Sequence, residues 1–185
     1  RQIGLVRELQ GLLTRTEWLV ESLLKLSKLD AGTATLAKDD ITVKSLIDRA
    51  SELLAIPMDL RNQSLAIQCA NEIFCGDLIW TAEALGNILK NCMEHTPDGG
   101  TITVTAEETA LFTQITVEDT GPGFEEKDIP HLFERFYKGD NASESSYGIG
   151  LALARMGITA QNGTIQAMNT DSGAKFVIKF YKQVI

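Results

Sequence analysis

Residues 85–102 read LGNILKNCMEHTPDGGTI, a stretch that holds a helix, its exit and the start of a strand. Asn87 and Asn91 are four residues apart, so on a helix their amides share one face and can point at one ligand. Carboxamide oxygens are suitable hard ligands for magnesium, which often holds phosphates through few protein contacts. Two asparagines on a helix are usually just solvated, so this pair gains meaning only from the stretches that follow it.

The stretch DTGPGF, residues 119–124, stands at the end of a predicted strand. Its two glycines, Gly121 and Gly123, let the backbone come close to a planar ligand. An ionised Asp119 can accept a hydrogen bond from the exocyclic amine of adenine, whereas guanine presents a carbonyl at that place. Selection of ATP and an ordinary strand-exit turn are equally consistent with these six residues alone.

Two further stretches complete the pattern. FERFYK, residues 133–138, offers aromatic anchors for a short helix, with Arg135 and Lys138 able to face phosphate oxygens. Taken alone, a solvated basic pair is the more common explanation. GIGLALA, residues 148–154, opens a predicted helix, and the bare amides of a helix N-terminus favour phosphate. A single G-x-G is weak evidence, and its value lies in its position after a polar segment.

The elements around these stretches alternate between strand and helix periodicity, with Asp77 as an N-cap. We expect an α+β fold, a two-layer α/β sandwich in which a mixed sheet carries helices on one face. We also expect residues 72–75 to pair with residues 64–69. The predicted strands are 41–43, 64–69, 72–75, 101–107, 112–118, 164–168 and 175–181, and the predicted helices are 45–60, 77–91, 129–136 and 148–162.

The first segment carries a leucine heptad, which predicts one helix over residues 2–29, about 40 Å long at ~1.5 Å per residue. Packing in a helix bundle or dimer is favoured over folding back on the rest of the chain. Gly32 can supply a left-handed cap at its end. We therefore predict a helical segment at 1–32, a hinge at 33–40 and a second domain at 41–185. The heptad positions are Leu5, Leu12, Leu19 and Leu26 in one series, and Leu9, Thr16, Leu23 and Asp30 in the other.

Composition narrows the function classes. A net charge of −8 over 185 residues and a pI near 4.8 argue against a nucleic-acid partner. The longest apolar runs are shorter than the ~20 residues that cross a membrane. The cysteines, Cys69, Cys75 and Cys92, lack metal-ligand spacing, and reduced thiols are favoured over a redox or metal role.

In order and spacing, the four stretches resemble the N, G1, F and G2 boxes of the sensor histidine kinases. These kinases belong to a wider ATPase superfamily that includes gyrase, Hsp90 and MutL. The N-terminal helix, ending in LSKLDAG, is similar to the second helix of that family's dimerisation and phosphotransfer domain. The resemblance covers nearly the whole chain and implies the Bergerat ATP-binding fold. It also implies ATP and Mg²⁺ as ligands.

The resemblance implies a role for each matching residue. Asn91 would bind magnesium, Asn87 would lie beside the phosphates, and His95 stands where the family often stacks an aromatic side chain on adenine. Asp119 would recognise the adenine amine. The remaining implied contacts are Gly121 and Gly123 at the base, Gly148 and Gly150 at phosphate, Leu151 near the base, and Arg135 and Lys138 at phosphate. The catalytic set that the resemblance implies is Asn87, Arg135 and Lys138.

Three features depart from the family pattern. Glu94 replaces a residue that is often basic, so it either points away or weakens the grip on phosphate. The predicted lid, residues 139–147, contains no Lys or Arg and offers Glu144 instead. No H box is present, because His95 belongs to the N box and His131 precedes the F box. We assign His131 to a surface or partly buried structural role.

We therefore expect an ATP-binding kinase domain that, in its parent protein, passes the γ-phosphoryl group to a histidine and then to a response-regulator aspartate. This chain should bind ATP without phosphorylating itself. We further expect a homodimer through the N-terminal helix and a cytoplasmic domain of a bacterial inner-membrane protein, whose membrane part lies upstream. Three alternatives remain: a clamp or chaperone ATPase of the superfamily, a serine kinase of the anti-sigma type, and a degenerate domain that binds nucleotide only to support dimerisation.

Overall fold

The computed structural model describes residues 2–140 and 147–183. The chain forms two compact units, divided between Thr35 and Leu36. Within the described residues, none of the helices combines the length and the apolar character needed to span a bilayer.

The first unit is helix α1, Gln2–Asp30, a single helix of 29 residues as predicted. Gly32 adopts a φ of +65° and ends it, while the Ala31 and Thr33 amides donate to the last carbonyls. Four heptad leucines are exposed, at 60%, 51%, 54% and 40% for Leu5, Leu9, Leu12 and Leu23. A helix with such a stripe is stable only if something covers it, because isolated helices are marginal in water.

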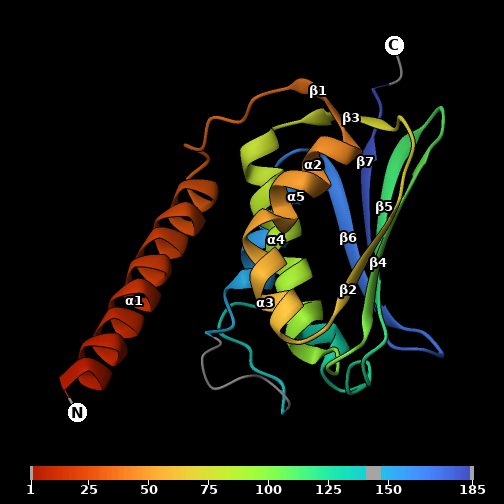
Figure 1. Cartoon of the computed structure of the whole chain (residues 1–185). Helices are drawn as coiled ribbons and strands as arrows, with labels where there is room; N and C mark the ends of the chain where they lie inside the picture. The colour runs from red at the N-terminus through yellow and green to blue at the C-terminus, as the bar shows by residue number, and fades with distance from the viewer. Residues whose placement is uncertain (1, 141–146, 184–185) are drawn as a thin grey trace. The chain divides into compact units, whose positions relative to one another are not determined.

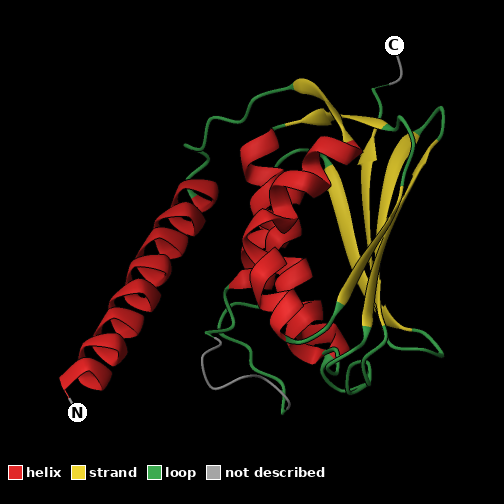
Figure 2. Ribbon diagram, viewed as in Figure 1, coloured by secondary structure: helices red, strands yellow, loops and turns green. Residues whose placement is uncertain are grey.

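The second unit is built on a five-stranded sheet in the order β2-β4-β5-β7-β6. Strand β2 runs parallel to β4, and the other neighbours are antiparallel, so the predicted mixed sheet is confirmed. The helices lie together on one face of this sheet (Figures 1 and 2). The strands of the sheet are β2 Ser64–Gln68, β4 Thr101–Glu108, β5 Phe112–Asp119, β6 Gly163–Asn169 and β7 Ala174–Tyr181. The helices are α2 Val43–Ser51, the 3₁₀ turn η1 Glu52–Leu54, α3 Ala55–Leu60, α4 Leu78–His95, the 3₁₀ turn η2 Ile129–His131 and α5 Gly150–Thr159.

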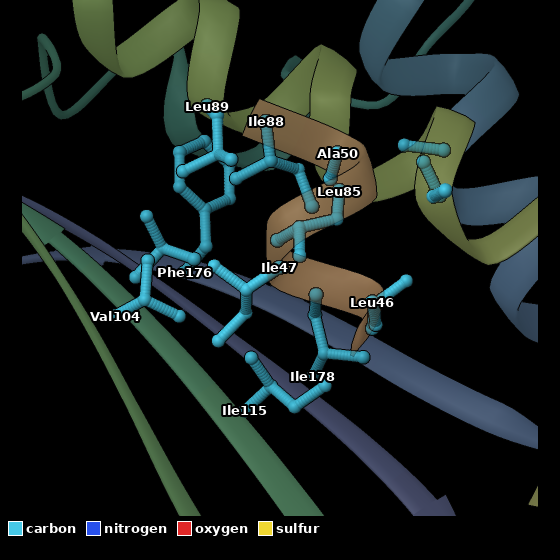
Figure 3. Packing of buried hydrophobic residues seen from close by; sticks show 14 of the residues in the cluster. Leu46, Ile47, Ala50, Leu85, Ile88, Leu89, Val104, Ile115, Phe176 and Ile178 are labelled. Carbon is cyan, nitrogen blue, oxygen red and sulfur yellow. The ribbon is translucent and has the colours of Figure 1, made fainter. Parts of the chain in front are cut away.

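The core lies between the sheet and helices α2, α4 and α5. Along strand β7, buried side chains alternate with partly exposed ones, so one face of the strand contributes to this core. Phe176 and Ile178 from β7 meet Leu85 and Ile88 from α4, all at most 1% exposed (Figure 3). Each such side chain contributes about 1.5–3 kcal/mol relative to leaving it in water. This shared core fixes α4 against the sheet.

The expected pairing of residues 72–75 with 64–69 is wrong. Strand β3, Ile73–Gly76, pairs antiparallel with β1, Asp39–Thr42, in a separate two-stranded sheet. Strand β2 pairs with β4 instead, and the free polar groups of Ile73 are satisfied by Glu108 and Thr113 from the neighbouring strands. Closeness in sequence suggested a hairpin, but long-range pairing decided the outcome.

Three helix predictions also need correction. Helix α4 continues to His95 rather than Asn91, because helical backbone first becomes unfavourable at Thr96, directly before Pro97. Helix α5 begins at Gly150, since Gly148 has a φ of +69°. The helix expected over 129–136 is only a three-residue turn, and Phe136 has a φ of +63°. The predicted N-cap at Asp77 is confirmed, with its carboxylate accepting from the Trp80 amide at 2.9 Å.

Candidate functional site

Helix α4 presents the first group of predicted site residues. Asn87, Asn91 and His95 recur every four residues, so they share one face of the helix. The Asn87 side-chain amide donates to the Gly150 carbonyl at 3.1 Å, which joins α4 to the first turn of α5. The His95 Nδ1 atom lies 2.8 Å from the Asn91 carbonyl, so the imidazole is held close to its own helix. The N-box and G2-box stretches therefore meet in the folded chain.

Asp119 ends strand β5 and is only 3% exposed. Its Oδ1 accepts from the amides of Gly121, at 2.9 Å, and Ala174, at 3.0 Å. These two backbone amides satisfy a buried carboxylate oxygen, which would otherwise be costly to hide from water. The side chain is thereby oriented by the loop that follows it and by the start of β7.

The G1 loop, residues 119–124, packs directly against the C-terminal end of α4, which we call its exit. A Cβ atom placed on Gly121 would lie 2.6 Å from the His95 carbonyl oxygen, closer than real side chains approach. Glycine is required at this position because of that approach, and not because of its backbone angles. The predicted adenine residues Asp119 and His95 thus come from segments in contact.

Cys92 adds an unexpected neighbour to this group. Burial raises the pKa of its thiol well above the ordinary value, and the adjacent Asp119 carboxylate raises it further, through its charge and a hydrogen bond from the thiol. The thiol therefore stays protonated and donates to Asp119. The sequence showed a cysteine after the N-box asparagine but gave no sign of this contact.

The hairpin between β6 and β7 supports the site, although the sequence predicted only its two strands. A Cβ atom on Gly173 would lie 2.1 Å from the Asp119 carbonyl oxygen. Asn169 accepts from the Phe124 amide at 2.7 Å and donates to the Phe124 carbonyl at 2.8 Å, so it pins the end of the G1 loop. Nothing local in the sequence could have revealed these contacts, which span about 45 residues or more.

The F-box stretch is anchored by aromatic contacts, as predicted. Phe133 and Phe124 both meet Phe176 edge to face, with ring centroids 6.3 and 5.6 Å away. The predicted phosphate contacts are both exposed. Arg135 lies against α5, with a guanidinium nitrogen 3.2 Å from the Met156 sulfur, and Lys138 lies 6.0 Å from the centre of the Tyr147 ring.

The C-terminal part of the F-box stretch contacts the G2 stretch. The Phe136 amide donates to the Gly148 carbonyl at 2.9 Å. A Cβ atom on Gly148 would lie 2.5 Å from the Tyr137 carbonyl oxygen, so this glycine is required by space as well as by its positive φ. Gly150 faces the Asn87 side chain, and Leu151 packs partly buried against the core.

Glu94 and His131, which were singled out against the family pattern, both have ion-pair partners. Glu94 lies 3.9 Å from Lys90 one turn earlier, and this weak ion pair offsets its charge. His131 is exposed and pairs with Glu134 at 2.8 Å. Glu144, named above in the predicted lid, lies outside the described residues.

Magnesium would have few protein ligands here. Across residues 2–140 and 147–183, no group of three or more His, Cys, Asp or Glu side chains could hold a metal ion. The amide oxygen of the half-buried Asn91 would suit a magnesium ion that keeps most of its other contacts with phosphates and water.

The family model for histidine kinase-, DNA gyrase B-, and HSP90-like ATPases matches residues 76–184. The chain belongs to this ATPase family. The match begins just before Asp77 and takes in all four stretches, so the predicted resemblance is confirmed. Within the family, the chain carries the ATP-binding catalytic domain of the sensor histidine kinases.

Similar proteins agree with this assignment. Sensor protein SphS of Synechococcus elongatus is 33% identical over 178 residues, which cover 89% of this chain and 42% of SphS. The histidine kinase AdeS of Acinetobacter baumannii has the same fold, with a TM-score of 0.80 at 23% identity over 95% of this chain and 84% of that one. The histidine kinase ThkA, solved in complex with the response regulator TrrA, gives a TM-score of 0.71 at 20% identity over 91% of this chain and 49% of that one. This chain thus corresponds to less than half the length of SphS.

Proposed function

We propose that this chain binds Mg–ATP between the α4 face, the G1 loop and the first turn of α5. In its parent protein it would supply the γ-phosphoryl group for transfer to a histidine outside these 185 residues. The observation that carries the proposal is the buried Asp119, oriented by the Gly121 and Ala174 amides. A fixed, desolvated acceptor of this kind suits the exocyclic amine of adenine and opposes the carbonyl of guanine.

The neighbouring residues have complementary roles in this proposal. Gly121 lets the G1 loop pack directly on the His95 backbone, so that these two segments would border the base together, and His95 would supply a ring for stacking. Asn87 and Gly150, already hydrogen-bonded to each other, would flank the phosphates at the N-terminus of α5. Arg135 and Lys138 are exposed side chains with enough reach to approach phosphate oxygens, and they would act only when nucleotide is bound.

The catalytic contribution of the chain would be positional. Phosphoryl transfer depends on alignment and on stabilising charge at the transferred group. Magnesium bound with the nucleotide supplies charge neutralisation at the phosphate oxygens. Asn91 would hold the metal, Asn87 would orient the phosphates, and Asp119 would keep the base in register.

A response regulator would receive the phosphoryl group from the histidine. The ThkA–TrrA complex shows this kind of assembly for a protein of the same fold, and we extend the expectation to the parent of this chain. Dimerisation through the exposed leucines of α1 belongs to the same proposal. The parent would be a sensor with its signal-receiving part elsewhere, in keeping with the sensor proteins it resembles.

Labelled ATP tests this function. With γ-labelled ATP, the parent protein should gain acid-labile, base-stable phosphate, and Asn91→Ala in the parent should abolish it. The 185-residue chain should bind the same ATP and remain unlabelled. Acid-labile phosphate on the 185-residue chain itself would contradict the proposal, because neither of its histidines is assigned as an acceptor.

A further inference from the structure

The exit of α4 is held by two side chains from the turn between α3 and β2. Gln63 donates from its amide nitrogen to the Met93 carbonyl, at 3.0 Å, and to the Thr96 carbonyl, at 2.7 Å. Arg61 donates to the same two carbonyls from its guanidinium group. We call these two side chains, Arg61 and Gln63, the exit clamp.

A helix C-terminus leaves carbonyl groups without intrahelical partners, and glycine commonly resolves this by turning the chain back. Here the residues after α4 are Thr96 and Pro97, so the chain leaves the helix in an extended conformation. No glycine can close the helix end at that point. The exit clamp supplies the missing donors instead.

The clamp is more specific than a general surface contact. Gln63 is 6% exposed, and its Oε1 finds no hydrogen-bond partner among the residues that the structure describes. A buried amide whose oxygen is unsatisfied carries a desolvation cost, so its retained nitrogen contacts must matter. Arg61 is fixed from its other side by an ion pair with Asp98, at 3.0 Å.

The clamped segment, residues 93–98, leads directly to the predicted adenine end of the site. It contains His95, whose carbonyl packs on Gly121 of the G1 loop. Two residues beyond the segment, Gly100 packs against Thr96 and Thr120, and Thr101 exchanges two hydrogen bonds with Thr120. Displacement of the α4 exit would therefore move His95 and the G1 loop, while Asn87 lies two turns back in regular helix.

We infer that Arg61 and Gln63 are positioning residues for the adenine end of the nucleotide site. They act through His95 and Gly121 and touch no nucleotide themselves. This inference rests on the proposed function, because it assigns the clamp to the base that the site would bind.

Calorimetric titration of Gln63→Met and Arg61→Met with ATP and with ADP, each with magnesium, tests the inference. Methionine keeps the length of Gln63 and the apolar stem of Arg61, and it removes the donors of both side chains. Each variant should bind both nucleotides about tenfold more weakly, by the same factor, because the base is common to ATP and ADP. Arg49→Met, an arginine on the exposed side of α2, is the matched control and should bind like the wild type.

The titrations are run well below each melting temperature, where a merely stabilising clamp would leave the dissociation constant unchanged. Unchanged affinity with a lowered melting temperature would overturn the inference, and so would a loss confined to ATP. If either methionine variant fails to fold, Arg61→Lys takes its place, since lysine keeps the charge but cannot reach both carbonyls as a fork. A wild type that binds neither nucleotide would instead overturn the proposed function, and the inference with it.

Discussion

Among single residues, Asp119 connects the parts of the site most directly. Its carboxylate links the G1 loop to the start of β7, and the Cys92 thiol of α4 lies beside it. Three segments far apart in sequence therefore converge on one buried charge. A residue in this position tolerates little change, because each of its partners would be left unsatisfied in a low-dielectric setting.

Asp119→Asn should weaken ATP binding by about tenfold to a hundredfold. Asparagine can still accept from the two backbone amides, but its NH₂ group would face the adenine amine donor to donor. Calorimetry on the folded variant measures the loss. Glu118→Gln is the control, since Glu118 precedes Asp119 on the opposite face of β5 and pairs with Lys175. Equal losses in the two variants would count against a specific role for Asp119.

The Cys92 thiol gives a pH prediction. Its pKa is raised in the folded state, so the folded chain holds the proton more tightly than the unfolded chain. The resulting stability is fully present below the unfolded pKa of about 8.5 and is lost as pH rises through the folded pKa. Urea unfolding between about pH 8 and pH 10 follows the free energy of unfolding as pH rises past the unfolded pKa of about 8.5. This free energy should fall more steeply for the wild type than for Cys92→Ala. Parallel curves would mean that the thiol is not perturbed.

At the level of helices and strands, local patterns predicted most of the fold. Alternation along β5 and β7, the N-cap at Asp77 and the spacing of Asn87 and Asn91 depend on neighbours within a few residues. The errors arose where long-range contacts decide. Strand β3 pairs with β1, and the side chains that complete its hydrogen bonds come from β4 and β5, about 35–40 residues away.

The same division holds for the site. Stretches predicted to form the site do contact one another, through Asn87 and Gly150 and through His95 and Gly121, whereas the residues that support these contacts were missed. Asn169 pins Phe124 from 45 residues away, and Gln63 reaches the α4 exit from 30 or more. No spacing rule within a single sequence identifies such partners, since any exposed asparagine or glutamine has the same local pattern.

The β6–β7 hairpin gives a prediction at this level. Gly173→Ala would place a Cβ atom 2.1 Å from the Asp119 carbonyl oxygen, so the hairpin or the end of β5 must shift. We expect a loss of about 3 kcal/mol in unfolding free energy and weaker ATP binding. Urea denaturation and calorimetry measure the two effects. Gly11→Ala is the comparison, because a Cβ atom there meets nothing within 4 Å and the residue lies in the regular backbone of helix α1, so this variant should bind ATP normally.

Over the whole molecule, the two units carry separate properties. The second unit has its own core and contains all of the predicted nucleotide residues. Helix α1 has a leucine stripe, four of whose members, Leu5, Leu9, Leu12 and Leu23, are exposed. Binding of nucleotide and association of chains should therefore respond to different substitutions.

Leu12→Glu tests that separation. We expect the wild-type chain to self-associate with increasing concentration and the variant to shift toward monomer, because a charge on the stripe opposes helix packing. Sedimentation measures the change, and the ATP dissociation constant should stay the same. Gln10→Glu, which adds the same charge to the same helix outside the heptad positions, provides the control for altered charge. Wild-type chains that remain monomeric at all concentrations would remove the support for dimerisation through α1.

The most direct test of the central claim is calorimetric titration of the wild-type chain with ATP and with GTP, each in the presence and absence of magnesium. Saturable binding of ATP that magnesium strengthens, with little binding of GTP, is the result that the buried Asp119 and the Asn87–Asn91 face predict. Equal binding of the two nucleotides, or binding of neither, would contradict the assignment of this site to ATP.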